Sequence, residues 1–221
     1  MSADNNDDDP EYVTYKVVLL GDAGVGKTSI ICRYVTNSFS SVLMSTTGAT
    51  YANKKLIVGN KKIRFEIWDT AGQERYRSLA KMFYQNANVI ILVYDITRKS
   101  SLNSINDFWI KQIRENARKD VILGLAGNKS DLYENEEVKL NEAKLFAKEI
   151  GAIFKTTSAK SSTGIDELFL QIGEKILNPN YNINVSNMNK EEELEYRKMM
   201  DKKKLRLEEA SKKTKDKVGC C

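Results

Sequence analysis

Hydrophobic residues in the middle of the chain follow two alternating patterns. Short, mostly apolar runs typical of strands lie at residues 15–20, 63–68, 89–94, 121–126 and 153–157. Apolar residues at helical spacing lie at residues 28–34, 105–113, 143–150 and 168–176. Residues 56–58 and 63–68 flank Gly59 and Asn60, which predicts a hairpin. The alternation predicts a doubly wound α/β sheet, with a ligand site at the carboxyl ends of its strands.

These patterns occupy one central segment of the chain. The only prolines, Pro10 and Pro179, bracket that segment, and we expect one folded domain over residues 13–178. Residues 1–12 are expected to form an acidic, disordered N-terminal tail. Residues 179–221 are rich in Asn, Lys and Glu, and residues 191–210 have helical propensity without a sustained apolar face. A flexible, solvated tail is therefore predicted after the domain.

Composition excludes several classes of function. Hydrophobic residues make up 41% and charged residues 29% of the 221, without an apolar run long enough for a transmembrane helix. The N-terminus lacks the basic and apolar parts of a signal peptide, and Ser2 argues against myristoylation. The chain has no His, which excludes Ser-His-Asp chemistry and His-ligated metals. A net charge of +5 is too small to suggest a nucleic-acid partner.

A phosphate-binding motif stands between the first predicted strand and helix. Residues 21–28 (GDAGVGKT) fit the pattern G-x-x-x-x-G-K-[ST]. Its glycines let backbone N–H groups turn toward phosphate oxygens at a helix N-terminus. Lys27 adds a positive charge at the β- and γ-phosphates, and the Thr28 hydroxyl can ligate Mg²⁺. The predicted phosphate-binding residues here are Ala23, Gly24, Val25, Gly26, Lys27, Thr28 and Ser29.

Three later motifs follow predicted strands and together distinguish a GTP site from an ATP site. They are residues 69–74 (DTAGQE), 128–131 (NKSD) and 158–160 (SAK). The Asp131 carboxylate can accept hydrogen bonds from guanine N1–H and the 2-amino group, and adenine offers neither donor. Each such bond is worth about 1.5–3 kcal/mol, so two give about two to four decades of preference for guanine. With these motifs in this order, the chain resembles the Ras superfamily of small GTPases over residues 13–178.

This resemblance implies a fold, a bound nucleotide and a base site. The fold would be the G domain of phosphate-loop NTPases, a mostly parallel six-stranded sheet with one antiparallel strand, and the ligands GTP or GDP with Mg²⁺. Asn128 would join the loops, the Lys129 stem would pack over the base, and the Ala159 N–H would meet guanine O6. The implied guanine site consists of Phe39, Asn128, Lys129, Asp131, Ser158, Ala159 and Lys160.

The resemblance also implies a metal site and a catalytic residue. Thr28 and Thr46 would ligate Mg²⁺ through their hydroxyls, and Asp69 would hold it through water. The Gly72 N–H would contact the γ-phosphate, and Gln73 would orient the attacking water. Because Thr46 and Gly72 both contact the γ-phosphate, hydrolysis would release two loops together.

Within the superfamily the chain is most similar to Rab proteins. Residues 92–97 (LVYDIT) match a Rab signature, and residues 219–221 (GCC) match a double-geranylgeranylation signal on Cys220 and Cys221. Three aromatic residues occupy positions that Rabs use to read effectors, with ordinary core aromatics as an equal alternative: Tyr51, Trp68 and Tyr84.

The Rab resemblance implies a set of partners and a location. It implies a monomer that meets an exchange factor, a GTPase-activating protein, a GDP dissociation inhibitor or escort protein, and GTP-dependent effectors. It also implies the cytoplasmic face of an intracellular membrane, and residues 48–49 and 126–132 most resemble endosomal Rabs. Ala23 replaces the Gly of Ras itself, which implies modestly slower intrinsic hydrolysis. Further departures leave the effector open: Thr47, Thr50-Tyr51 and Gln85-Asn86.

Two other interpretations remain open at this point. The chain could be another phosphate-loop NTPase, such as an ATPase or nucleotide kinase, and residues 128–131 and 158–160 argue against it. It could also be a non-catalytic, GTP-locked tether, and the presence of Gln73, Thr46 and Asp69 argues against that.

Overall fold

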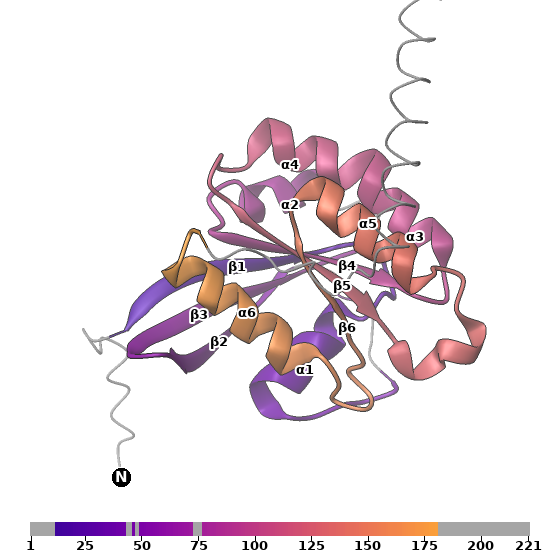
Figure 1. The fold of residues 1–221 in the computed structure, drawn as a ribbon, viewed down its shortest axis with the longest axis horizontal. Coiled ribbons are helices and arrows are strands. Elements are labelled where there is room, and N and C mark those ends of the chain that lie inside the picture. The colour runs from indigo at the N-terminus through magenta and orange to yellow at the C-terminus, as the bar shows by residue number, and fades with distance from the viewer. Residues whose placement is uncertain (1–11, 43–45, 47–48, 73–76, 181–221) are drawn as a thin grey trace, which may run out of the picture. The chain divides into compact units, whose positions relative to one another are not determined.

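The structure is a computed structural model that describes residues 12–42, 46, 49–72 and 77–180. Strands and helices alternate along this part of the chain (Figure 1). The strands are β1 Val13–Leu20, β2 Ala49–Val58, β3 Lys61–Thr70, β4 Val89–Asp95, β5 Ile122–Asn128 and β6 Ile153–Thr156. The α-helices are α1 Lys27–Thr36, α2 Arg77–Tyr84, α3 Lys99–Ser104, α4 Ile110–Asn116, α5 Leu140–Ile150 and α6 Ile165–Leu177. A π-helical segment, Ile105–Trp109, joins α3 to α4, and a 3-10 helix spans Ser130–Asn135.

The strands form a single six-stranded sheet in the order β2-β3-β1-β4-β5-β6. Strand β2 pairs antiparallel with β3, and the other neighbouring pairs are parallel. This confirms the predicted doubly wound, mostly parallel sheet with one antiparallel strand. The carboxyl ends of β1, β3, β4, β5 and β6 therefore lie along one edge, where their connecting loops meet.

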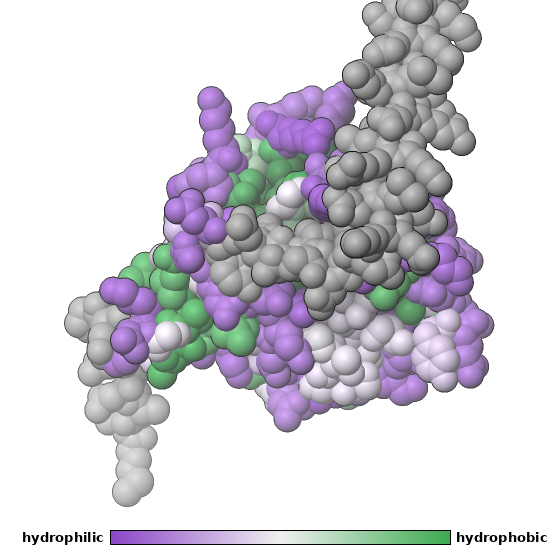
Figure 2. All heavy atoms as spheres, in the orientation of Figure 1, coloured by the Kyte–Doolittle hydropathy of each residue, from purple (hydrophilic) through white to green (hydrophobic). Residues whose placement is uncertain are grey.

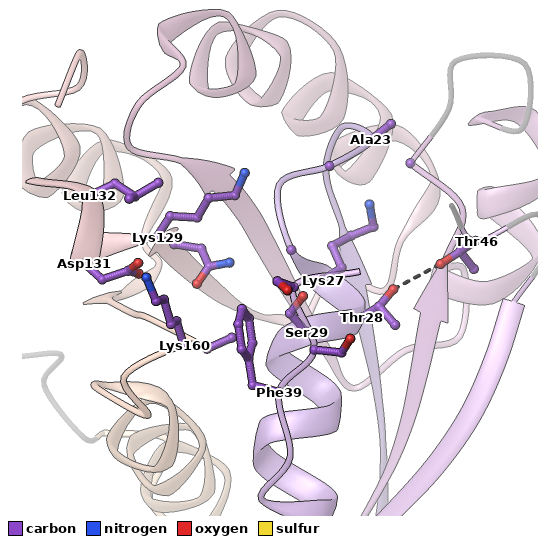
Figure 3. Close-up of a pocket in the computed structure, with 17 residues that line it drawn as sticks. Ala23, Lys27, Thr28, Ser29, Phe39, Thr46, Lys129, Asp131, Leu132 and Lys160 are labelled. Carbon is purple, nitrogen blue, oxygen red and sulfur yellow. Dashed lines mark hydrogen bonds between the residues drawn. The ribbon is translucent and has the colours of Figure 1, made fainter. Parts of the chain in front are cut away.

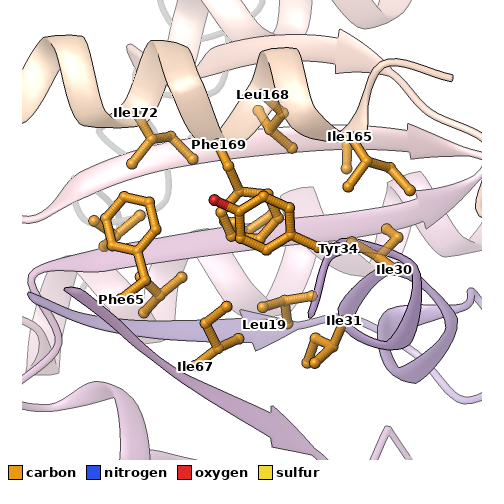
Figure 4. Packing of buried hydrophobic residues seen from close by; sticks show 14 of the residues in the cluster. Leu19, Ile30, Ile31, Tyr34, Phe65, Ile67, Ile165, Leu168, Phe169 and Ile172 are labelled. Carbon is orange, nitrogen blue, oxygen red and sulfur yellow. The ribbon is translucent and has the colours of Figure 1, made fainter. Parts of the chain in front are cut away.

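Helices cover both faces of the sheet, which explains why its central strands are continuously apolar (Figure 1). Along β1, Val17 and Leu19 pack toward α1 and α6, whereas Val18 and Leu20 belong to the second core cluster with residues of α2 to α5. In the first cluster the rings of Tyr34 and Phe169 stack with centroids 3.8 Å apart (Figure 4). All seven residues of β4 are buried, as a strand covered on both faces requires.

Several elements differ from their predicted extent. Strands β2 and β3 are ten residues each, longer than the predicted runs, because β2 is an edge strand that includes polar positions such as Asn53 and Lys55 among its exposed residues. The helix predicted over residues 105–113 is part of the longer α3–π–α4 unit, which begins at Lys99. Helix α2 and the 3-10 helix were not predicted, and none of the six residues of the 3-10 helix is buried. The 3-10 helix therefore lacks the buried periodicity on which prediction depends, whereas α2 buries Ala80 and Tyr84 at helical spacing in a segment of only eight residues.

On the face shown in Figure 2, most of the coloured surface is hydrophilic. On the face shown, hydrophobic side chains gather where β1 begins and β2 ends, and Val13 and Ile57 of these strands are 54% and 65% exposed. Within the described ranges, no helix has both the length and the apolar character needed to cross a membrane.

Candidate functional site

A pocket of about 450 Å³ lies at the edge of the sheet where the strands end (Figure 3). Its lining comes from the loops after β1, β3, β5 and β6 and from the segment after α1. The lining residues are Ala23, Gly24, Gly26, Lys27, Thr28, Ser29, Phe39, Ser40, Ser41, Thr46, Gly72, Asn128, Lys129, Asp131, Leu132, Ala159 and Lys160. Most of the residues predicted to bind the nucleotide thus surround one cavity, and Ser40, Ser41 and Leu132 join them without having been predicted.

The loop after β1 needs glycine at two positions. Gly26 caps α1 with a φ of 96°, and a Cβ there would lie 2.3 Å from the Asn128 amide nitrogen. Gly21 has a φ of 145°, and a Cβ there would lie 2.2 Å from the Val93 carbonyl oxygen. The glycines let the loop approach two neighbouring strands closely and turn into the helix. The first turn of α1 therefore presents its unpaired N–H groups to the pocket.

Lys27 is held in the loop by its own backbone. Its Nζ donates to the carbonyl oxygens of Gly21 at 2.9 Å and Asp22 at 3.0 Å, and the residue is 5% exposed. Burial lowers the pKa of Lys27 to about 8, against the opposing attraction of Asp69 and Asp22. An anion in the pocket would stabilise the charged form of this amine, because an opposite charge nearby favours ionisation.

The side chains of Thr28, Thr46 and Asp69 form a cluster of oxygen atoms next to Lys27. The Thr28 hydroxyl donates to Asp69 Oδ2 at 2.5 Å and lies 3.0 Å from the Thr46 hydroxyl, which is 3.4 Å from the same Oδ2. Asp69 Oδ1 is buried with no hydrogen-bond partner among the described residues. Burial raises the pKa of Asp69 above its usual value. Hard oxygen donors and an unsatisfied buried carboxylate oxygen fit Mg²⁺, which would stabilise the carboxylate.

The opposite end of the pocket is tied together by side-chain hydrogen bonds. Asn128 Nδ2 donates to the Val25 carbonyl at 2.8 Å, and Thr157 Oγ1 donates to Asn128 Oδ1 at 3.2 Å. Ser158 Oγ donates to Asp131 Oδ1 at 2.5 Å, which orients that carboxylate. Asn128 thus joins the loop after β1 to the loops after β5 and β6, and Asp131 is held at the pocket wall.

Asp95 is a site residue that sequence reasoning missed. Its Oδ2 lies 2.6 Å from Lys129 Nζ, and its Oδ1 accepts from the backbone N–H and hydroxyl of Thr97. Burial alone would raise the pKa of Asp95, but the hydrogen bonds from Lys129 and Thr97 outweigh it and leave the pKa below its usual value. Asp95 therefore sets the direction of the Lys129 side chain. Its place at the end of an apolar strand was visible in the sequence, but its pairing with Asn128 across β4 and β5 was not.

The remaining predicted residues lie elsewhere. Val25, Asp69 and Ser158 are buried beneath the pocket rather than lining it. Gln73, Cys220 and Cys221 lie outside the described residues. Of the aromatic triad, Tyr51 is exposed and makes an edge contact with the half-buried Trp68, with ring centroids 5.4 Å apart. Tyr84 differs from the expectation of an effector-facing residue, because it is 1% exposed and belongs to the core under α2 to α5.

Comparison with known proteins agrees with this geometry. The model of the Ras family matches residues 16–178. Ras-related protein Rab-31 of Rattus norvegicus is 44% identical over 171 residues, which cover 76% of this chain and 87% of that protein. Ras-related protein Rab-22A of Homo sapiens is 42% identical over 168 residues, or 76% and 86% of the two chains. Ras-related protein Rab5 of Nicotiana tabacum is 42% identical over 161 residues, or 73% and 80%.

The fold and the pocket define a phosphate-loop nucleotide-binding protein of the small-GTPase class. The matches cover most of the chain at more than two-fifths identity, and the chain belongs to the Rab family within the Ras superfamily. Small GTPases of this family hydrolyse GTP, and the family is one of GTP/GDP switches in vesicle trafficking.

Proposed function

We propose that this chain binds GTP and GDP in the pocket after β1 and hydrolyses GTP slowly. The proposal rests on the two ends of one cavity. One end has the phosphate loop and the oxygen cluster of Thr28, Thr46 and Asp69, and the other has the Asp131 carboxylate. The carboxylate would accept the two donors of guanine, and the phosphate loop would take the phosphates on the helix N-terminus. Adenine has neither of these two donors, so binding ATP would desolvate the Asp131 carboxylate without supplying those hydrogen bonds.

Each described residue has a defined task in this proposal. Lys27 would place its remaining N–H donor on the β- and γ-phosphates, since its other two are bonded to carbonyls of the loop. Thr28 and Thr46 would ligate Mg²⁺, and Asp69 would hold it through a water molecule. The metal would neutralise negative charge on the phosphate oxygens. The Gly72 N–H would contact the γ-phosphate at the rim of the pocket, where a side chain would collide with Lys27 Nζ.

Gln73 would orient the water that attacks the γ-phosphate. Gln73→Leu keeps the approximate size of the side chain but removes its hydrogen-bonding amide, so intrinsic turnover should fall and the GTP form should accumulate. Phosphate release from the purified chain measures this directly. An activating protein that supplies an arginine should still accelerate the parent by roughly 10³–10⁵. Equal intrinsic rates for Gln73→Leu and the parent would show that Gln73 does not have this role.

We also propose that two geranylgeranyl groups on Cys220 and Cys221 anchor the protein to the cytoplasmic face of an intracellular membrane, of endosomal type. One lipid chain holds a protein only marginally, so stable anchoring takes two signals. Residues 212–217 carry four Lys and one Asp, and each basic residue near an anionic leaflet adds about 1 kcal/mol. The proposed partners are an exchange factor, an activating protein, a dissociation inhibitor that shields the lipids, and effectors that meet Tyr51 and Trp68.

Fractionation of cells tests the anchor. Replacing both Cys220 and Cys221 by Ser should move the protein to the soluble fraction and leave its GTP affinity unchanged, because the pocket lies within residues 23–160. The single replacements are matched controls that leave one thiol. If the double variant is recovered with membranes as fully as the parent, the anchor does not depend on these cysteines.

A further inference from the structure

Arg98, which has no role in the nucleotide site proposed above, extends from the segment after β4 to the phosphate loop. Its guanidinium donates from Nη2 to the carbonyl oxygen of Ala23 at 2.9 Å. The backbone of Arg98 is fixed on both sides, because its N–H donates to the backbone carbonyl oxygen of Asp95 at 3.0 Å and its carbonyl accepts from the Ser101 hydroxyl at 2.6 Å. The side chain therefore extends from a rigid base at the start of α3.

The peptide that Arg98 contacts joins Ala23 to Gly24, both of which line the pocket. In a trans peptide the C=O and the following N–H point in opposite directions. With the Ala23 carbonyl turned out toward Arg98, the Gly24 N–H is turned the other way, toward the phosphate side of the loop. The adjacent Asp22 carbonyl points inward and accepts from Lys27 Nζ at 3.0 Å.

Gly24 itself does little to hold this orientation. It has a φ of 75°, and a Cβ built on it would meet nothing within 4 Å, so its surroundings do not restrain it sterically. Glycine adopts positive and negative φ with similar ease, and the peptide before it can rotate. A rotated peptide would turn the Ala23 oxygen toward the phosphates and take the Gly24 donor away. A carbonyl oxygen facing the phosphates would repel them, and the loop would lose one N–H donor.

A second contact holds the residue just before this peptide. The Ser104 hydroxyl, at the end of α3, donates to Asp22 Oδ1 at 2.8 Å. The π-helical segment Ile105–Trp109 begins at the next residue, and its turn is wider than that of an α-helix. Two consecutive loop residues are thus bonded to one short segment of the chain, Arg98 to Ser104.

We propose that Arg98 is a positioning residue that locks the Ala23–Gly24 peptide with its N–H toward the phosphates, and that this lock slows the release of nucleotide. This inference rests on the proposed nucleotide site. Arg98 acts through the backbone of the loop and does not itself touch the nucleotide.

The test measures release of a fluorescent GDP analogue from the full-length chain with Mg²⁺ present. Arg98→Ala should release it about five- to tenfold faster, the effect of losing roughly one hydrogen bond. Arg98→Lys retains N–H donors on a side chain of nearly the same length and should restore most of the parent rate, whereas the shorter Arg98→Gln should behave like Arg98→Ala. Arg118→Ala is the matched control, because that exposed arginine bonds to Asp120 away from the pocket and its loss should change nothing.

A second readout follows the peptide itself. In ¹⁵N-labelled GDP-bound protein, the Gly24 amide proton should move upfield in Arg98→Ala and return in Arg98→Lys. A merely structural contribution of Arg98 would lower the melting temperature without selecting this amide. If Arg98→Ala matches the parent in release rate and Gly24 shift, or if Arg98→Lys behaves like Arg98→Ala, the lock is wrong. A parent that fails to retain GDP at all would instead reject the proposed nucleotide site.

Discussion

The two ends of the pocket differ in the groups that they present to a ligand: side chains at the guanine side, around residues 128–131, and mainly backbone N–H groups at the phosphate side, in the loop after β1. On the guanine side, Asn128, Lys129 and Asp131 are each held by another side chain of the protein. On the phosphate side, the donors are backbone N–H groups and the Lys27 amine, and the Asp69 carboxylate keeps a buried oxygen without a partner among the described residues. The guanine side is complete as folded, whereas the phosphate side needs a cation and an anion to satisfy it.

This difference separates two properties that binding measurements usually combine. Preference for guanine should depend on contacts that exist before the nucleotide arrives, and should be insensitive to Mg²⁺. Affinity and lifetime should depend on the phosphate side and vary strongly with Mg²⁺. Variants on one side should therefore change one property and leave the other. Asp131→Asn and Thr28→Ala test this separation, and Asp95→Asn tests what holds Lys129 on the guanine side.

The largest effect is expected on the guanine side. Asp131→Asn exchanges a carboxylate that accepts two hydrogen bonds for an amide that can also donate, so the variant should lose about two to four decades of affinity for guanine nucleotides. It should bind xanthine nucleotides instead, because the amide can donate to the 2-oxo group. Competition between GDP, XDP and ADP measures the shift. An unchanged preference for GDP would separate Asp131 from base recognition, and the Mg²⁺ dependence of binding should stay as in the parent.

The sequence predicts the parts of the pocket that depend on local patterns, and it does not predict contacts that depend on the order of strands in the sheet. The strands β4 and β5 and the loop residues 21–28 were predicted because their apolar runs and glycines are local patterns. Asp95 and Arg98 were missed because their partners, Lys129 and Ala23, come next to them only through the order of strands in the sheet. Tyr84 shows the converse: an aromatic at a familiar position does not reveal whether it packs inward.

A smaller effect is expected on the phosphate side. Thr28→Ala removes one of the two hydroxyl oxygens proposed to ligate Mg²⁺, and even changes to groups that only support a metal ligand typically cost about 10–100-fold in metal affinity. Chelation of Mg²⁺ with EDTA should accelerate GDP release from the parent much more than from Thr28→Ala. Thr28→Ser keeps the hydroxyl and is the matched control. The preference for GDP over ADP should be the same in all three proteins, and a change in that preference would contradict the separation of the two sides.

The smallest effect concerns the support of the guanine side. Asp95→Asn keeps an acceptor for Thr97 but loses the charge that pairs with Lys129 Nζ at 2.6 Å. Hydrogen bonds between charged groups contribute about 1.5–3 kcal/mol, and Lys129 is 34% exposed to screening water. We therefore expect the free energy of unfolding to fall by about 1–2 kcal/mol at pH 7.

The contribution of Asp95 to the free energy of unfolding should depend on pH. The folded state lowers the pKa of Asp95 below its ordinary value of 3.8, so the carboxylate is favoured by folding. Its contribution is fully present above that ordinary value and is lost as the pH falls through the lower, folded pKa. Urea unfolding of the parent and of Asp95→Asn should therefore differ most at neutral pH, and the difference should shrink below about pH 4. A difference that is constant from neutral to acidic pH would show that packing, rather than the charge of Asp95, holds Lys129 in place.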